Sequence, residues 1–323
     1  MSSSIFVGQS LAHDARWQEI IHSYTFSLFN ACRILRTWPA ILRPIVVWFI
    51  KDAKLCRARL TEARKIVASH APEVSSEATA FTWMDDRADP AVIQLALAAG
   101  ALHTTSQLLN QALLDLAYAG SEGQAIIKDI QSEARNCTTP TGGSILPSTL
   151  PKMVALEACI KETQRLKPQT MTNLDRLAMR PVILPNGLRL PKGTMISVDQ
   201  SVMQQTQTWG EDALAWNPSR WIKYNDSDQA EFVGHDKLVN SNERHFAFGK
   251  GRFICPGRFL VNGELKVAMV LILNGWDVRL AQQDYERLKT KDLGRVPWVP
   301  YGFEMLADDE IVIEVRKSQE RTL

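Results

Sequence analysis

Several features that would assign a function quickly are missing from this 323-residue sequence. Its 37 basic and 35 acidic residues nearly cancel, so no charge excess favours nucleic acid as a partner. Its five cysteines are widely spaced and form no CxxC pair or cysteine–histidine cluster, which argues against zinc and for a reducing compartment. Internal repeats and low-complexity tracts are absent. Neither GxGxxG nor GxxxxGK[ST] occurs, which removes the common phosphate-binding loops.

A long apolar run is also missing. Residues 1–8 carry no basic segment and no extended apolar segment, so we expect neither a signal peptide nor a membrane anchor. The most apolar early stretch, residues 38–50, is interrupted by two prolines and is shorter than the roughly 20 residues that span a bilayer. It either lies in a membrane interface, with Arg36 and Lys51 reaching outward, or forms a buried helix–turn–helix corner. We therefore expect the chain to be cytoplasmic or peripheral at a membrane.

The apolar periodicity predicts a mainly α fold with small β-sheets toward the C-terminal end. Asp89-Pro90 suits the start of a long helix that runs to about Ala119 and would span roughly 45 Å. A second helix is predicted to begin at Pro151 and to end before Pro168. We treat residues 1–323 as a single domain, whose first part, residues 15–165, is helical with loops near 70–80 and 136–150. Residues 170–247 form a hairpin, over 182–198, and irregular chain. Residues 246–275 form a glycine-rich loop and a helix that begins at Pro256, and short strands follow within 277–315.

The strongest chemical signal is the segment FAFGKGRFICPGRF, residues 246–259. Phe248, Gly251 and Gly257 lie seven before, four before and two after Cys255. Such a loop would deliver a thiol to the N-terminus of a helix, where the dipole and free N–H groups favour a thiolate. Phe248 would shield the sulfur from water. Taken alone, the segment is also compatible with a structural glycine turn that holds a chance cysteine.

Two helical segments add to this signal. Glu162 and Arg165 are three residues apart and share a helix face, although such pairs are usually solvated. In the long helix, the stretch AGALHTTS over 99–106 contains Gly100, which costs about 1 kcal/mol relative to alanine in a helix interior. His103 and Thr104 follow it. Space for a small ligand is one explanation for Gly100, and a tight helix crossing with a core histidine is the other.

Together these segments resemble the cytochrome P450 family, whose haem-binding loop reads Phe-Gly-x-Gly followed by Cys-x-Gly. The spelling Gly-Arg-x-x-Cys-Pro-Gly-Arg-Phe is similar to the fungal branch that oxidises terpenoids and related secondary metabolites. The resemblance implies the cytochrome P450 fold and haem b (iron protoporphyrin IX), with Cys255 as the iron ligand. The implied cofactor-binding residues are Cys255, Phe248, Gly251, Arg252 and Gly257.

The resemblance also assigns roles to the helical segments. The run Trp216-Asn217-Pro218-Ser219-Arg220-Trp221 is similar to the family's Pro-x-Arg-Phe segment. The family then implies a structural network of Glu162, Arg165 and Arg220 beneath the haem loop. It also implies a dioxygen groove at Gly100, with Thr104 and His103 delivering protons.

The implied activity is that of a monooxygenase that hydroxylates or desaturates a hydrophobic small molecule with O2. Electrons would come from NADPH-cytochrome P450 reductase, attracted by Lys250, Arg252 and Arg258. Phe253 stands where the family usually has arginine or histidine facing a haem propionate, so Arg252 and Arg176 become candidate partners. A haem-thiolate isomerase or dehydratase is an alternative function.

The resemblance begins in the family's middle, and the sequence therefore predicts a fold that lacks the family's N-terminal third. That third would hold the membrane anchor and the propionate-binding helix. We accordingly expect substoichiometric haem binding. A truncated, non-catalytic remnant is a further alternative.

Overall fold

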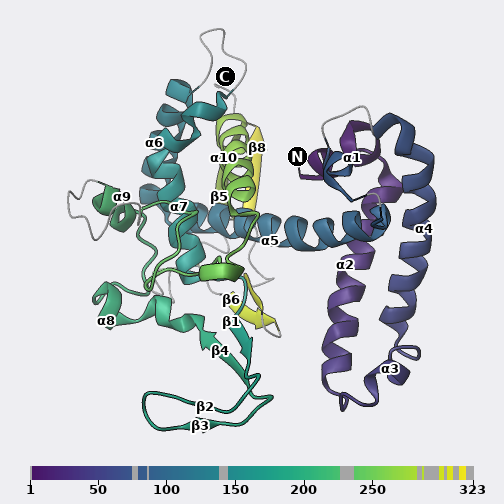
Figure 1. Cartoon of the computed structure of the whole chain (residues 1–323). Coiled ribbons are helices and arrows are strands. Elements are labelled where there is room, and N and C mark those ends of the chain that lie inside the picture. Colours follow the sequence, from purple (N-terminus) through teal and green to yellow (C-terminus); the bar gives the residue numbers. More distant parts are fainter. Residues whose placement is uncertain are drawn as a thin grey trace. The chain divides into compact units, whose positions relative to one another are not determined.

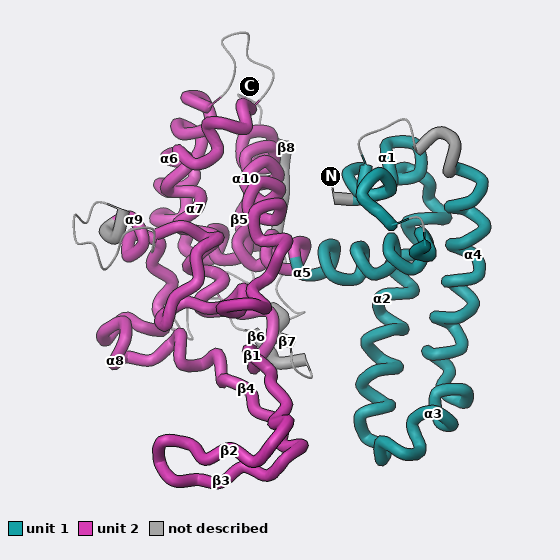
Figure 2. The backbone as a smooth tube through the Cα atoms, viewed as in Figure 1, with its two compact units in different colours: residues 1–104 teal, residues 105–323 magenta. Residues whose placement is uncertain are grey.

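The computed structural model describes residues 2–74, 79–85, 87–137, 145–225, 236–281, 286, 298–301, 304–307 and 313–317. Its chain is mainly helical with small antiparallel sheets, which confirms the predicted fold class (Figure 1). The contacts divide the chain into two compact units, residues 1–104 and 105–323 (Figure 2). The single domain over 1–323 stays a prediction.

The first unit is built on an antiparallel pair of long helices. Asp14 caps the first of them, because its carboxylate accepts a hydrogen bond of 2.6 Å from the Trp17 N–H. Trp17, Ile20 and Ile21 are buried in the unit's core. The prediction that residues 15–69 are helical is therefore confirmed, with a break at the turn between the long helices. The helices are α1 (Ser2–Ala12), α2 (Ala15–Arg36), α3 (Arg43–Val46), α4 (Lys51–Val74) and the 3₁₀ turn η1 (Ala80–Trp83).

The predicted long helix is present as α5 (Pro90–Tyr118). Asp89 begins it, since its Oδ1 accepts hydrogen bonds from the N–H groups of Ala91 (3.0 Å) and Val92 (3.4 Å). The boundary between the two units falls within α5, after Thr104. In the described part of the chain, α5 alone is long and apolar enough to cross a membrane, a criterion that core helices of soluble proteins also meet.

The core of the second unit lies between α6, α7 and α10, and buried side chains from residues 108–117 of α5 also contribute to it. The predicted start of α7 at Pro151 is wrong. Pro151 lies inside a 3₁₀ turn, and Met153 adopts a non-helical ψ of 79° before the α-helix begins at Val154. The predicted end before Pro168 is confirmed, since α7 ends at Leu166. The helix stops there because a residue that precedes proline disfavours the α conformation. The elements are α6 (Gly120–Cys137), η2 (Pro147–Lys152), α7 (Val154–Leu166), η3 (Gln200–Gln204), α8 (Thr206–Trp209), α9 (Ser219–Asn225), η5 (Gly251–Phe253) and α10 (Arg258–Gly275).

Among the residues that the structure describes, four two-stranded antiparallel sheets complete the unit. The predicted hairpin over 182–198 is correct only up to residue 190. Gly187, with a φ of 85°, makes its turn. The strand after this hairpin, residues 195–199, pairs instead with residues 172–177, which follow α7. The pairs are β1 (Thr172–Leu177) with β4 (Met195–Asp199), β2 (Val182–Ile183) with β3 (Arg189–Leu190), β5 (Trp276–Leu280) with β8 (Ile313–Lys317), and β6 (Trp298–Tyr301) with β7 (Glu304–Ala307).

The remaining expectations lie partly outside the described residues. The predicted strand near residue 277 is confirmed as β5, and β8 is its partner. Residues 311 and 312, predicted as strand, are outside the described part, as are residues 75–78 and 138–144 of the two predicted loops. Both loops were predicted too long, because residues 70–74 belong to α4, residues 136–137 to α6 and residues 147–150 to η2. The helix predicted at Pro256 begins at Arg258 and ends, as predicted, at Gly275.

Candidate functional site

The loop before α10 presents a single thiol. Gly249 and Gly251 have φ values of 76° and 70°, a region that side chains with a Cβ rarely adopt. These two turns bring the chain back, so that the Cys255 N–H donates a 2.8 Å hydrogen bond to the carbonyl of Phe248. Gly257 then caps α10. The structure thus gathers Phe248, Gly251, Cys255 and Gly257 into one turn at a helix N-terminus.

Two of these glycines have neighbours at ordinary van der Waals distances. A Cβ added to Gly257 would lie 3.9 Å from the Cys255 sulfur. A Cβ on Gly249 would lie 3.5 Å from the Phe253 carbonyl oxygen and 3.6 Å from Oδ1 of Asn173. Phe248 is partly buried and packs against the core between α6, α7 and α10. The loop therefore packs against the core through Phe248, and the half-buried Cys255 thiol lies at the edge of the loop.

Asn173 of β1 holds the start of the loop, a contact that the sequence did not indicate. Its Nδ2 donates to the carbonyls of Phe246 (3.1 Å) and Ala247 (3.2 Å). Ser241 Oγ donates to the Gly249 carbonyl at 2.5 Å. Both side chains satisfy carbonyl groups that the irregular loop leaves without ladder partners, so they stabilise the loop's shape.

The chemistry of the thiols fits haem ligation by Cys255. A metal-ligating sulfur must be a thiolate. Burial raises the pKa of Cys159 well above its ordinary value and that of Cys56 to about 11, so neither thiol is suited. Within the described residues, no group of three or more His, Cys, Asp or Glu side chains could hold a metal ion. A lone thiolate at a helix N-terminus suits a metal whose other ligands come from a porphyrin.

Two arginines flank Phe253, the residue that departs from the family pattern. Its side chain is 67% exposed. The guanidinium of Arg176, from β1, lies 4.8 Å from the ring centroid, and that of Arg252 lies 5.6 Å from it. The aromatic ring thus contacts two cations, and positive charge is retained beside the loop.

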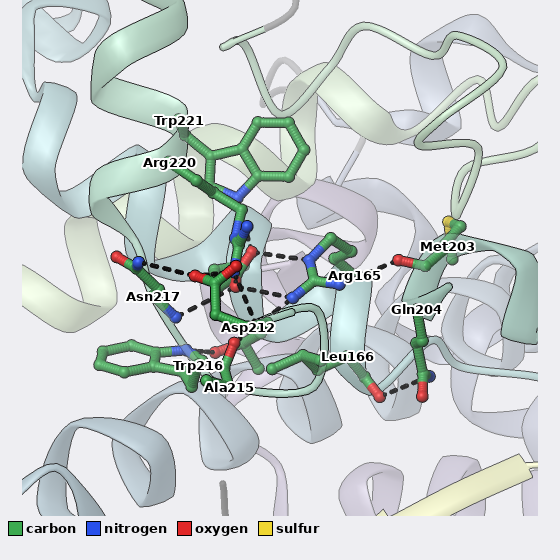
Figure 3. Close-up of polar contacts among 12 residues, drawn as sticks. Arg165, Leu166, Met203, Gln204, Asp212, Ala215, Trp216, Asn217, Arg220 and Trp221 are labelled. Carbon is green, nitrogen blue, oxygen red and sulfur yellow. Dashed lines mark hydrogen bonds and ion pairs between the residues drawn. The ribbon is translucent and has the colours of Figure 1, made fainter. Parts of the chain in front are cut away.

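The structure also brings Glu162, Arg165 and Arg220 together in a buried cluster. Figure 3 labels its two arginines and their neighbours. Glu162 Oε1 accepts hydrogen bonds from Arg165 Nη2 (2.8 Å) and Arg220 Nε (2.9 Å). Its Oε2 accepts from Arg165 Nε and from Trp221 Nε1, both at 2.9 Å. The Asn217 N–H adds a fifth bond of 3.1 Å. The Glu162 and Arg165 side chains have no solvent exposure, and that of Arg220 is 9% exposed.

Met203 joins this cluster to the thiol loop. Its carbonyl accepts a 3.0 Å hydrogen bond from Arg165 Nη1. Its sulfur lies 3.3 Å from the Phe246 N–H, which donates to it. Figure 3 shows Arg165 extending from the cluster toward Met203. No sequence pattern indicated Met203, whose two hydrogen bonds connect the cluster to the start of the loop.

Arg220 reaches a second carboxylate at the edge of the cluster. Its Nη2 lies 3.1 Å from Oδ2 of Asp212, whose side chain is half exposed. The guanidinium groups of Arg165 and Arg220 lie 5.1 and 5.6 Å from the ring centroid of Trp209. The cluster therefore ties α7, α8 and α9 together, and stacking on an aromatic face adds to its ion pairs.

His103 and Thr104 belong to the first unit. Thr104 is exposed, and its hydroxyl donates to the Gly100 carbonyl at 2.9 Å. A Cβ on Gly100 would meet nothing within 4 Å. The His103 ring contacts two side chains of α2, Phe26 at 4.8 Å and His22 at 5.6 Å between centroids. Burial, and next the charge of His22, lower the pKa of His103, so its imidazole is neutral at neutral pH.

Comparison with known proteins gives one family. The sequence profile of the family Cytochrome P450 matches residues 85–306. Cytochrome P450 monooxygenase pyr3 of Aspergillus fumigatus is 31% identical over 99% of this chain and 62% of its own length. Cytochrome P450 monooxygenase adrA of Penicillium rubens is 32% identical over 99% and 63%, and hepE of Aspergillus oryzae is 33% identical over 87% and 54%. The chain thus spans less than two thirds of the length of these relatives.

Proposed function

Since the chain belongs to the cytochrome P450 family, we propose that it is a haem-thiolate monooxygenase that oxidises a hydrophobic small molecule. The observation that carries the proposal is the turn over residues 248–257, which presents the half-buried Cys255 thiol at the start of α10. The group that it would hold is haem b. When bound, haem supplies the activation of dioxygen with electrons that derive from NADPH.

The residues of the loop hold and orient the group. Cys255 is the proposed ligand, and its sulfur would bind the iron as a thiolate. Phe248 excludes water from one side of the sulfur. Arg252 and Arg176 are the candidate partners of the haem carboxylates, because both guanidinium groups lie beside the loop and a buried carboxylate requires a cation or hydrogen-bond donor.

The proposed role of Thr104 and His103 is to deliver protons. A hydroxyl can pass a proton on only if it is first supplied with one, and a neutral imidazole can accept and release protons near neutral pH. The lowered pKa of His103 keeps it in that neutral form. Glu162, Arg165 and Arg220 take no part in proton transfer, and their role is to fix the loop through Met203.

The proposed substrate is a fungal secondary metabolite, and a terpenoid is the class that the spelling of the Cys255 loop favours. The fungal monooxygenases to which the chain is similar support a secondary metabolite as substrate, and the terpenoid class rests on the spelling of the loop alone. The proposed electron donor is NADPH-cytochrome P450 reductase, with Lys250, Arg252 and Arg258 as its docking cations. Peripheral contact with a membrane is also part of the proposal.

The carbon monoxide spectrum of the reduced protein tests the ligand. The wild-type chain with haem should show the Soret band of a thiolate-ligated iron. Cys255→Ala should lose this band, whereas Cys159→Ala, at a buried thiol, should keep it. Loss of the band in Cys159→Ala with retention in Cys255→Ala would show that the assignment is wrong.

Oxygen incorporation tests the reaction itself. With the reductase and NADPH, ¹⁸O2 should label the product of a hydrophobic substrate. A product that forms without NADPH and carries no ¹⁸O would instead identify an isomerase or dehydratase. A protein that takes up no haem would identify a non-catalytic remnant.

A further inference from the structure

Three aromatic rings connect α2 to α5 within the first unit. His22 and Phe26 lie about one turn apart on α2, and His103 lies on α5. The ring centroids are 4.7 Å apart between His22 and Phe26, 4.8 Å between Phe26 and His103, and 5.6 Å between His22 and His103. Each ring therefore contacts the other two, and we call these three residues the aromatic triad.

The aromatic triad surrounds the His103 ring on two sides. Phe26 meets this ring edge to face, at an interplanar angle of 74°, and the His22 ring is tilted against it by 41°. His103 is half-buried, whereas His22 is exposed to solvent. An exposed imidazole beside a half-buried one is an arrangement that can carry protons inward from water, because both rings titrate near neutral pH and accept and release protons readily.

The charged groups around the aromatic triad leave His22 as the nearest titratable partner of His103. On α5, the nearest charged residue is Asp115, about 18 Å further along the helix at 1.5 Å per residue. The helix α1 and the turn η1 contain no ionisable side chain. The charges next to His22 on α2 and α4 neutralise one another in four ion pairs, which are Arg16–Glu19, Arg16–Glu62, Arg59–Glu19 and Arg59–Glu62.

Contact between two imidazoles limits the charge that they carry together. Two neighbouring groups of like charge disfavour each other's charged form, so their protons are gained in coupled steps. Burial lowers the pKa of His103, and the charge of His22 lowers it further. Near neutral pH, the pair therefore carries one extra proton in preference to two, and this proton can be exchanged between the rings.

We propose that His22 is a positioning residue of the proton relay assigned to Thr104 and His103, an inference that rests on the proposed function. Water protonates the exposed His22 ring, and His22 passes this proton, directly or through one water, to one ring nitrogen of His103 while the other nitrogen releases one. Thr104 accepts the released proton through water as its own hydroxyl proton leaves for the acceptor, so each residue ends with the charge it had. Phe26 keeps the His103 ring in the orientation that this exchange requires.

Nuclear magnetic resonance of the histidine-labelled chain tests the coupling of the two rings without haem and without turnover. His22→Phe keeps an aromatic ring in the triad and removes the charge, so the pKa of His103 should rise. His22→Lys keeps a positive charge throughout the titration of His103, so this pKa should fall instead. A merely structural role of His22 would move the pKa of His103 in the same direction in both variants. His13→Phe, at an exposed histidine just before α2, is the matched control and should leave the pKa of His103 unchanged.

The pH dependence of peroxide formation tests the relay in the haem-loaded protein with its reductase. His22→Phe should form at least about twofold more hydrogen peroxide per NADPH than the wild type at about pH 8, since the outer proton donor is missing. The excess should shrink toward about pH 6, where water protonates His103 directly. The carbon monoxide spectrum should keep its thiolate band, and His13→Phe should give the wild-type ratio at every pH.

Two results would overturn the inference. The same pKa of His103 in the wild type, His22→Phe and His22→Lys would show that the rings are not coupled. A peroxide ratio in His22→Phe that equals the wild-type ratio at every pH would show that protons reach Thr104 without His22. Neither result touches the assignment of Cys255, whereas a wild-type chain without the thiolate band would overturn the proposed function itself.

Discussion

Replacing Glu162 by glutamine should destabilise the fold more than any other single change in the buried cluster. The substitution keeps the shape of the side chain and removes its charge. One of the two oxygens, which together accept five hydrogen bonds, becomes an amide NH2. At either position this NH2 faces at least two donors, so at least two bonds are replaced by contacts between donors.

The loss in the free energy of unfolding can be estimated from the ion-pair partners that Arg165 and Arg220 keep in the variant. Without the Glu162 charge, Arg165 is fully buried and has no carboxylate within the described part of the chain, and Arg220 keeps only the half-exposed Asp212. Breaking one partner of a buried ion pair costs about 3–5 kcal/mol. A typical domain has a free energy of unfolding of about 5–15 kcal/mol, so the expected loss is a large fraction of the total. Arg220→Ala should cost less, because Arg165 still neutralises Glu162.

Urea unfolding followed by circular dichroism measures this loss. We expect the midpoint of Glu162→Gln to fall by at least about 1 M relative to the wild type. Asp212→Asn is the matched control, since it makes the same chemical change at a half-exposed carboxylate and should cost below about 1 kcal/mol. Equal losses in the two variants would refute the argument, because burial would then contribute nothing.

Three further changes have defined outcomes. Thr104→Ala should leave substrate affinity nearly unchanged and divert NADPH electrons to hydrogen peroxide, measured as peroxide per NADPH, while Thr104→Ser should not; an unchanged peroxide yield would place the relay elsewhere. Asn173→Leu should leave the Ala247 carbonyl without its donor, while the Phe246 carbonyl keeps the Gly249 N–H, and should cost about 1–3 kcal/mol in urea unfolding; a loss near zero would show that water replaces the amide. Burial lowers the pKa of Lys161 from 10.5 to about 7, so the unfolded chain binds more protons between these pH values and the free energy of unfolding rises with pH there. Lys161→Met should flatten this rise and Lys192→Met, at an exposed lysine, should not; an unaltered slope in Lys161→Met would contradict the lowered pKa.

Local signals made part of this structure predictable. The Asp89-Pro90 cap and the glycine turn that ends at Cys255 depend on neighbours in the sequence, and both lie where they were expected. The start of α7 was misplaced at Pro151, because a 3₁₀ turn accepts proline as readily as the first turn of an α-helix. Asn173 and Met203 could not be found, since they reach the loop across 73 and 43 residues and no spacing rule covers such a contact.

The charges of α7 were the feature most easily misjudged, because glutamate and lysine or arginine at helical spacing usually mark a solvated face. Every residue from Leu156 to Leu166 is buried instead. Its charges are satisfied by three other helices: Glu157 by Lys266 of α10, Glu162 by Arg220 of α9, and Lys167, just after α7, by Asp115 of α5. Thr163 also donates to Asp115, at 2.8 Å.

These ion pairs determine the register of α7 more strictly than apolar contacts alone would. A rotation or a shift of one turn would leave three buried charges without partners, each at a cost of several kcal/mol, whereas apolar side chains would only be repacked. Met203 links α7 to the thiol loop, because its carbonyl accepts a hydrogen bond from the Arg165 side chain and its sulfur accepts one from the Phe246 N–H. Charges that do not bond to Cys255 thus contribute to the position of its sulfur, and Lys266→Met, on α10 and eleven residues after Cys255, should broaden the Soret band before it unfolds the protein. A Lys266→Met variant with an unchanged band and an unchanged urea midpoint would show that packing alone sets the register.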